Sequence, residues 1–580
     1  MKPPPIPIGI DDFRTIRERN LEYVDKSDLI RQLIDREGVQ VALLPRPRRF
    51  GKTLNLSMLR CWFEKTDADL SPLFQGLSIW QAGADYRAHF QRYPVIHFNF
   101  KGSKGATFDA TLTALREKII DLYETHRIVL DSGRLDDVAA RRYRQVLDGT
   151  AERPLYERAL LDLSGYLHAH HGEKVVILID EYDEPIHAGH VHGYSAEILG
   201  FMRTFLGEGL KSNTHLHKAV VTGILRVAKE NLFSGLNNLG VYTLLAQAFN
   251  TCFGFTEAEV AALAERHGKS DRMPDIRRWY NGYVFGGEVI YNPWSVCSYL
   301  ERGEDAPAPY WLSTSSNDLV HELLDLYAFE LQPVFESLLG GGSVEVALDE
   351  NVVLSDIRQS PDALWSLLVF SGYLKAEAAP PDALGNRMFR LAIPNHEVRG
   401  VYSGSFKRFL DQRARAAGGS VAALTKALLG GDAETLELQL QALLTHMLSY
   451  HDVGGAFPER VYHGFVLGLL AVLETTHEVR SNRESGDGRP DVLIRPRTPG
   501  KPGAVMELKV ARPSRKTLRQ ALSEGLSQLE GTDYAAELRS SGASPVHAFV
   551  VAFDGKRVRV AVPTPKTRPA GRRKSASKKR

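Results

Sequence analysis

Two separate groups of residues in this 580-residue sequence have the types and spacing that phosphate chemistry requires. The first is the run Gly51-Lys52-Thr53, which follows a short apolar segment and opens a stretch with helical periodicity. In such a loop, backbone N–H groups and the helix N-terminus face a bound phosphate. We predict that Lys52 reaches the β- and γ-phosphates of a nucleotide and that the Thr53 hydroxyl ligates Mg²⁺. The predicted nucleotide-contacting loop residues are Arg49, Phe50, Gly51, Lys52, Thr53 and Leu54.

One position of this loop departs from the usual pattern. A standard phosphate loop has glycine where this chain has Arg46, and an arginine there restricts the backbone and adds charge. The loop pattern alone therefore does not identify the site. A second feature supports it, because the apolar run 175–179 ends in Asp180 and Glu181. Open α/β sheets present their ligand-binding residues at such carboxyl ends of strands.

The two acids complete a predicted site for ATP hydrolysis. Asp180 is expected to hold the Mg²⁺ shell, and Glu181 to orient or deprotonate a water for attack on the γ-phosphate. Thr222 ends a later apolar run and is a candidate sensor of the γ-phosphate, and Arg226 follows it as a candidate phosphate contact. For an isolated Gly-Lys-Thr the alternative is an ordinary helix cap, and the acidic strand makes that alternative much weaker.

The second group consists of Asp491, Glu507 and Lys509. Side chains two apart on a strand project to one face, so Glu507 and Lys509 point together, and Asp491 can join them from a neighbouring strand. Two carboxylates suit Mg²⁺ or Mn²⁺, and Lys509 can position a water and balance developing charge. The alternative is a surface pair on an edge strand. The apolar frame VMELKV favours the site, because buried charges need a metal or a partner.

The elements that must position these residues are predicted to form an α/β protein. Short apolar runs alternate with helical stretches in the first third and predict buried parallel strands at residues 39–45, 93–100, 174–180 and 217–223. Thr256 and Glu259 form a capping-box pattern that starts a helical region. Residues 319–449 read as mostly helical, with linker or hairpin sites at 340–343 and 378–386. The C-terminal part reads as helix 459–473, strands 478–482, 491–494 and 504–510, helix 518–529, and strands 547–553 and 558–563.

These patterns predict five segments. They are an α/β domain with a phosphate-binding loop, a helical region, a mostly helical linker, a second α/β domain and a disordered basic tail, at residues 1–250, 251–330, 331–455, 456–565 and 566–580.

The composition is close to that of an average soluble protein, with 43% hydrophobic and 24% charged residues. The net charge is 72 − 70 = +2, although residues 566–580 carry eight Lys or Arg and no acid. This tail predicts a solvated arm, with loose contact to nucleic acid as the alternative. Three scattered cysteines favour a reducing compartment. The N-terminal residues lack a secretory pattern, and no apolar run is long enough to span a bilayer, so we expect a cytoplasmic protein without membrane contact.

Several phrases resemble the predicted AAA-ATPase-like family over about residues 5–292. They are PIGIDDF, YVDKSDLI, RPRRFGKTL, LIDEYDEPI, TGILRVAKENLFSGLNNL and FGFTEAEV. The resemblance implies a P-loop ATPase core with a helical lid. In that family RPRRFGK replaces the leading glycine of the loop, so Arg46 looks typical of it.

Residues 459–553, including GRPDVLI and MELKV, resemble the PD-(D/E)XK nuclease-like domain that often follows this ATPase type. The resemblance implies a restriction-endonuclease-like core with Asp491, Glu507 and Lys509 as its catalytic set. Glu459 is a candidate extra metal ligand, and Gln528 and Tyr534 match the family's trailing Gln and Tyr. An ordinary helix-surface role is the alternative for each.

Three functional hypotheses follow. The leading one is an ATPase that couples to or gates a metal-dependent nuclease acting on DNA or RNA, a combination suited to defence against foreign nucleic acid. The second is a nucleotide-gated switch with a non-cleaving nucleic-acid-binding module. The third is a homo-oligomeric scaffold whose assembly is regulated by ATP.

Overall fold

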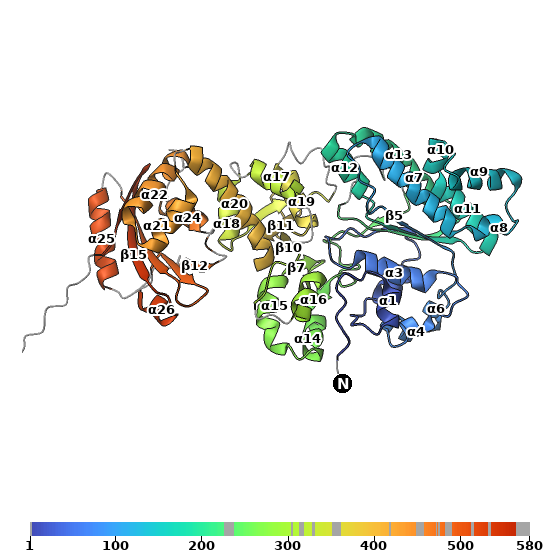
Figure 1. Ribbon diagram of the computed structural model, residues 1–580, viewed down its shortest axis with the longest axis horizontal. Coiled ribbons are helices and arrows are strands. Elements are labelled where there is room, and N and C mark those ends of the chain that lie inside the picture. The colour runs from blue at the N-terminus through green and yellow to red at the C-terminus, as the bar shows by residue number, and fades with distance from the viewer. Residues whose placement is uncertain are drawn as a thin grey trace, which may run out of the picture. The chain divides into compact units, whose positions relative to one another are not determined.

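The computed structural model divides into two compact units (Figure 1). The first comprises residues 1–323 and 343–401, and the second residues 324–342 and 402–580. The structure describes residues 3–225, 232, 237–302, 306–311, 318–327, 331–350, 361–416, 419–447, 458–470, 473, 476–481, 490–511, 516–531 and 535–563. Arg226, Tyr534 and the predicted basic tail, residues 566–580, lie outside the described residues. Within them, no helix combines the length and apolar character needed to cross a membrane.

A five-stranded parallel sheet forms the centre of the first unit, with strand order β2-β3-β4-β1-β5. The strands are β1 (Val41–Leu43), β2 (Val95–Asn99), β3 (Val175–Asp180), β4 (Leu216–Val221) and β5 (Leu239–Val241). The four strands predicted from apolar runs are confirmed, and β3 is buried at every residue, as expected for a strand covered on both faces. The short strand β5 was not predicted, because its three residues are only half-buried.

Helices cover both faces of this sheet, so the fold is the predicted α/β type. Figure 1 shows α7 (Phe108–Thr125), α11 (Ala159–His171) and α13 (Ser195–Leu210) on one side. On the other side lie α1 (Phe13–Glu18) and α3 (Lys52–Phe63). The carboxyl ends of β1, β3 and β4 therefore lie side by side at one edge of the sheet, where α3 begins.

Helices follow in the segment that was predicted to be a helical lid. It contains α14 (Glu257–Arg266), α15 (Met273–Tyr280) and α16 (Pro293–Arg302), which pack around a shared apolar core. The predicted capping box at α14 is confirmed, since Thr256 and Glu259 exchange hydrogen bonds between side chains and backbone N–H groups. A small antiparallel sheet within the lid, of order β6-β8-β7, was not predicted; its strands are β6 (Phe255–Thr256), β7 (Tyr283–Phe285) and β8 (Glu288–Tyr291).

The region expected to be mostly helical contains helices and also a sheet. The helices are α17 (Asp318–Tyr327), α18 (Gln332–Leu339), α19 (Pro361–Phe370), α20 (His396–Ala416), α21 (Val421–Gly430) and α22 (Ala433–Met447). An antiparallel sheet of order β10-β11-β9 was not predicted; its strands are β9 (Val344–Ala347), β10 (Lys375–Ala379) and β11 (Met388–Ala392). The predicted linker or hairpin site 378–386 overlaps the end of β10 and most of the connection to β11, and the two strands form a hairpin. The alanine-rich β10 has helical propensity, and pairing with β11 overrides it.

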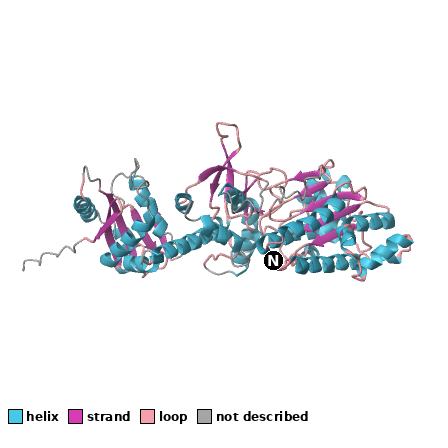
Figure 2. Ribbon diagram, turned by 90° about the horizontal axis from the view of Figure 1, so that it is seen from above, coloured by secondary structure: helices cyan, strands magenta, loops and turns pink. Residues whose placement is uncertain are grey.

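The second unit is built on a five-stranded sheet of order β12-β13-β14-β15-β16 (Figure 2). Its elements follow the predicted order: α24 (Pro458–Leu470), β12 (His477–Ser481), β13 (Val492–Pro496), β14 (Gly503–Val510), α25 (Leu518–Gly531), α26 (Ala535–Ser540), β15 (Val546–Asp554) and β16 (Arg557–Ala561). Only α26 was not predicted. The β14–β15 pair is parallel and the other pairs are antiparallel, so α25 lies in the crossover between these two strands.

Arg46 occupies a position that the sequence did not predict. Its side chain is 0% exposed and donates to the carbonyls of Pro45, Tyr242 and Phe249 at 2.8, 2.7 and 3.2 Å. The guanidinium also lies 5.0 Å from the Phe253 ring centroid. Burial lowers its pKa to about 10. The expectation that Arg46 adds charge to the loop was therefore wrong, because its charge is directed into the protein, toward carbonyls that follow β5.

Replacing Arg46 with the glycine of the standard loop should therefore weaken the fold. Arg46→Gly leaves three carbonyls without their donor and opens a cavity, so we expect a loss on the order of 3 kcal/mol in the free energy of unfolding. Urea unfolding followed by tryptophan fluorescence measures this, with the exposed Arg19→Gly as the control. A wild-type midpoint for Arg46→Gly would show that the buried arginine is not a main support of the loop.

Candidate functional site

The phosphate loop connects the end of β1 to the first residue of α3, Lys52. The Arg46 backbone N–H donates to the Gly223 carbonyl at 3.0 Å, so the first half of the loop follows the end of β4. Arg49 and Gly51 have φ of 67° and 84°, in the left-handed region. Glycine adopts this conformation without strain, which explains Gly51 directly before the helix. The neighbouring Phe50 is buried against rings of the lid, and Leu54 is half-buried.

Lys52, the lysine predicted to contact phosphates, is the first residue of α3. It is 4% exposed, and its ammonium donates to the backbone carbonyls of Arg46 and Pro47 at 3.1 and 3.2 Å. The Glu181 carboxylate lies 3.7 Å away. The loop carbonyls thus hold the cation at the carboxyl end of the sheet, beside the acid that was predicted to act on water.

Asp180 brings the predicted metal-binding residues together. It is 0% exposed; the Thr53 hydroxyl donates to its Oδ2 at 2.7 Å, and the Thr222 hydroxyl donates to its Oδ1 at 2.6 Å. The side-chain amide of Asn99, paired with Asp180 across β2 and β3, lies 3.4 Å from Oδ2. The structure therefore joins Thr53 to Asp180 and turns the buried Thr222 hydroxyl toward Asp180.

Two acids follow Asp180 with different surroundings. Glu181 has a φ of 53°, a strained conformation for glutamate of the kind that often occurs at functional sites. Asp183, which was not predicted, is buried, and its Oδ2 accepts from the backbone N–H groups of Ile224 and Leu225 at 2.8 and 3.0 Å. Burial, reinforced by the nearby Glu181 charge, raises the pKa of Asp183 to about 6. Its signal in the sequence is the third acid of LIDEYDEP.

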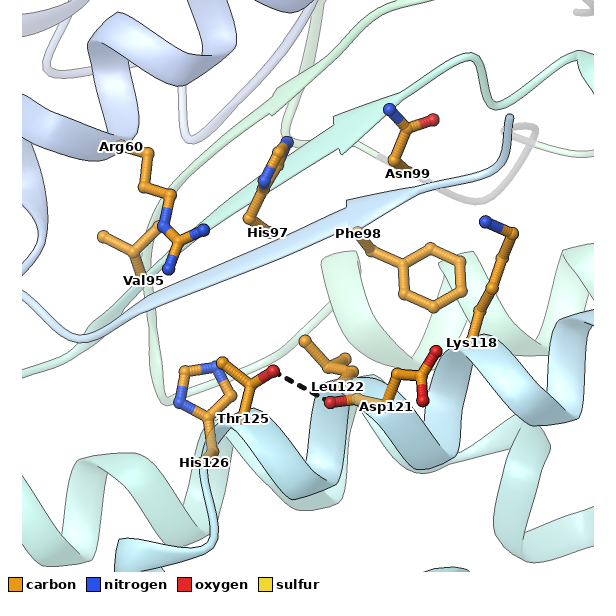
Figure 3. Close-up of a pocket in the computed structure, with 10 residues that line it drawn as sticks. All are labelled: Arg60, Val95, His97, Phe98, Asn99, Lys118, Asp121, Leu122, Thr125 and His126. Atoms are coloured by element: carbon orange, nitrogen blue, oxygen red, sulfur yellow. Dashed lines mark hydrogen bonds between the residues drawn. The ribbon is translucent and has the colours of Figure 1, made fainter. Parts of the chain in front are cut away.

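A pocket of about 220 Å³ lies along the outer edge of β2 (Figure 3). Its lining comes from α3, β2, α7 and the residue that caps α7: Arg60, Val95, His97, Phe98, Asn99, Lys118, Asp121, Leu122, Thr125 and His126. Of the described phosphate-loop residues, none lines it. Only Asn99 belongs both to this lining and to the described surroundings of Asp180. The pocket is therefore separate from the phosphate loop but adjacent to the buried Asp180 carboxylate.

The structure also brings together Asp491, Glu507 and Lys509, the second predicted group, which lies within the second unit. The Lys509 ammonium donates to Glu507 Oε1 and to Gln528 Oε1, each at 2.8 Å. Asp491 lies directly before β13, and its Oδ2 accepts from the Leu508 backbone N–H at 2.7 Å. Glu507 is 1% exposed on the central strand β14, so the surface-pair alternative was wrong. Burial raises the pKa of Glu507, Lys509 acts to lower it, and the Asp491 charge also raises it.

The chemistry of this group fits a divalent metal. Glu507 Oε2 is buried and has no hydrogen-bond partner among the described residues. Within the described residues, no group of three or more His, Cys, Asp or Glu side chains is placed to hold a metal. Mg²⁺, however, commonly binds through one or two carboxylates and completes its shell with water and substrate phosphates. Asp491 and Glu507 supply such a pair, while the side chain of Glu459 on α24 is not among those described.

Comparison with known proteins finds a family model over the region that contains each group. Residues 7–233 match the family model described as "Predicted AAA-ATPase". Residues 457–562 match the model of the PD-(D/E)XK nuclease superfamily. The chain is also 31% identical over 397 residues to the "Uncharacterized protein in vnfD 5'region" of Azotobacter chroococcum mcd 1, an alignment that covers 68% of each protein. The chain therefore belongs to the predicted AAA-ATPase family and carries a C-terminal domain of the PD-(D/E)XK nuclease superfamily.

Proposed function

We propose that the protein hydrolyses ATP in its first unit and uses the nucleotide state to gate metal-dependent cleavage of DNA or RNA in its second. The observation that carries the proposal is that each unit holds its own pair of carboxylates with a lysine, and one carboxylate of each pair is buried: Asp180, with Glu181 and Lys52, and Glu507, with Asp491 and Lys509. Foreign nucleic acid is the substrate that the defence hypothesis assigns to this activity.

The contacts of the first site support the ATPase half. Lys52 is held by weak neutral acceptors, the carbonyls of Arg46 and Pro47, which phosphate oxygens would displace. Thr53 and Asp180 would hold Mg²⁺, which supplies charge neutralisation for the β- and γ-phosphates when bound. Thr222 keeps the Asp180 carboxylate fixed. Glu181 orients the attacking water and accepts its proton.

The contacts of the second site support the nuclease half. Asp491 and Glu507 would hold a divalent ion, which supplies Lewis-acid polarisation of the scissile phosphate when bound. Lys509 positions a water and offsets the charge that develops on the phosphate. Gln528 fixes the Lys509 ammonium from α25, so the helix in the β14–β15 crossover contributes to the site.

Lys52→Ala tests the ATPase half. We expect it to lower Mg²⁺-dependent phosphate release on the order of 100-fold or more, because the charge that contacts the β- and γ-phosphates is lost. The matched control is Lys174→Ala, an exposed lysine next to the opposite end of β3. Equal rates for wild type and Lys52→Ala would refute ATP hydrolysis at this loop.

Variants of the second site test the nuclease half. Asp491→Ala and Glu507→Gln should abolish divalent-dependent cleavage of a panel of single- and double-stranded DNA and RNA. Lys509→Ala should lower cleavage on the order of 100-fold while leaving metal binding in place. Glu537→Gln, an exposed glutamate on α26, is the matched control. Binding without cleavage in the wild type would instead favour the non-cleaving switch, and cleavage that persists in Asp491→Ala would place the activity elsewhere.

Asp183→Asn tests the surroundings of the acidic strand through pH. Since the pKa of Asp183 is raised to about 6 in the folded protein, folding gains stability from the bound proton at low pH. That gain is present below the ordinary aspartate pKa and is lost as the pH rises through about 6. The asparagine of the variant does not titrate, so only the wild type loses this stability. The thermal midpoint of the variant minus that of the wild type should therefore increase from about pH 4.5 to about pH 7.5. Asp67→Asn, at an exposed position, is the control. If the midpoint difference between Asp183→Asn and wild type does not change with pH, the raised pKa of Asp183 is contradicted.

A further inference from the structure

A buried glutamate outside both proposed sites joins three segments of the first unit. Glu397 lies in the first turn of α20 and is 1% exposed. Its Oε1 accepts from the Trp311 backbone N–H at 2.6 Å, and its Oε2 accepts from the Ser295 hydroxyl at 2.8 Å. Burial raises the pKa of Glu397 to about 7. Because each oxygen has a donor, the carboxylate fixes the start of α20 to α16 and to the backbone at Trp311.

The same segments hold the phosphate loop. The Trp311 indole N–H donates to the Arg48 backbone carbonyl at 3.2 Å. Trp294, the neighbour of Ser295, has its ring centroid 4.3 Å from the Arg49 guanidinium carbon, a cation–π contact. The left-handed backbone of Arg49 is strained and persists only where its surroundings hold it. The loop geometry at Arg48 and Arg49 therefore depends on segments that are bonded to Glu397.

The helix that carries Glu397 belongs to both compact units. The first unit ends at Val401, within α20, and the remainder of this continuous helix belongs to the second unit. The N-terminus of α20 is fixed by Asn395, which accepts from the Val398 backbone N–H at 3.0 Å and donates to the Asn281 carbonyl at 2.8 Å. A change in the contacts of Glu397 thus acts on a helix that the two units share.

We propose that Trp311 and Glu397 transmit the nucleotide state of the phosphate loop to α20 and, through this helix, to the second unit. The inference rests on the proposed function, since it names the residues through which ATP gates cleavage. Bound phosphates draw Lys52 away from the carbonyls of Arg46 and Pro47, which frees the loop backbone one residue before the carbonyl that Trp311 contacts. A shift of the Arg48 carbonyl moves the Trp311 indole that is bonded to it. The movement reaches Glu397 through the bond from the Trp311 backbone N–H. Both are positioning residues, and neither touches the reacting atoms.

Trp311→Phe separates the two contacts of this residue. It removes the indole N–H that bonds to Arg48 and keeps a ring and the backbone N–H that bonds to Glu397. Hydrogen exchange of backbone amides in residues 396–402 is measured with and without Mg²⁺ and a non-hydrolysable ATP analogue. In the wild type we expect the nucleotide to change the exchange rate of these amides on the order of fivefold or more, which is the lower range of allosteric coupling. We expect Trp311→Phe to lose this change.

Nuclease assays give a second readout of the same variant. Trp311→Phe should retain the nucleotide-free cleavage rate of the wild type and lose the change that ATP produces. Glu397→Gln, which replaces one acceptor oxygen with a donor group, should lose the ATP effect as well while retaining nucleotide binding. Trp80→Phe, a tryptophan on α5 (Ser78–Gln81), is the matched control and should behave as wild type.

The outcomes separate this inference from the function on which it rests. Binding of a fluorescent ATP analogue is measured on every variant. A wild type that binds no nucleotide overturns both the proposed function and the inference. A wild type that binds nucleotide with unchanged exchange at residues 396–402 overturns the inference alone. So does a Trp311→Phe variant that binds nucleotide and keeps the wild-type exchange response or the wild-type ATP effect on cleavage.

Discussion

The bond between the Thr53 hydroxyl and the buried Asp180 carboxylate is the contact around which the first unit is organised. A carboxylate withdrawn from water needs donors, and Thr53 and Thr222 supply one to each oxygen. These two donors come from the start of α3 and the end of β4, so satisfying one charge fixes the phosphate loop against the carboxyl end of the sheet. The order of β3, β4 and β1 in the sheet is what makes this meeting point available.

The same constraint recurs at the other buried charges. Glu507 is balanced by Lys509, Glu397 by the donors at Trp311 and Ser295, and Arg46 by three carbonyls. The partners differ in kind. Arg46 meets only neutral backbone acceptors, which suits an architectural support, whereas Glu507 keeps one oxygen without a partner among the described residues and is the acid that suits an added ligand. An unpartnered buried oxygen is not confined to Glu507 among the described residues, since Asp183 Oδ1 beside the first site also lacks a donor, whereas each oxygen of Glu397 has one.

Local patterns were sufficient to predict the central strands and the two acid–lysine sets, because each depends on a short run of residues. Continuous apolar runs locate β1 to β4, and the spacing of Glu507 and Lys509 places them on one face of a strand. The strands β5 and β9 pair with distant segments, β1 and β11, which a single run does not reveal. The inward direction of Arg46 depends on the carbonyls of Tyr242 and Phe249, which lie 196 and 203 residues later. Glu397 was not predicted for the same reason, since Ser295 and Trp311 lie about a hundred residues before it.

The parallel pairing of β1 has a consequence for the protein during its synthesis. Val41 pairs with Ala219 on one side and with Leu239 on the other. At a synthesis rate of about 5–20 residues per second, the ribosome needs on the order of ten seconds or more to supply these partners after β1 has emerged. During that interval the strand that leads into the phosphate loop has neither neighbour of the finished sheet. The nascent chain must therefore keep an apolar segment from aggregation, by chaperone contact or transient collapse, before a nucleotide site exists.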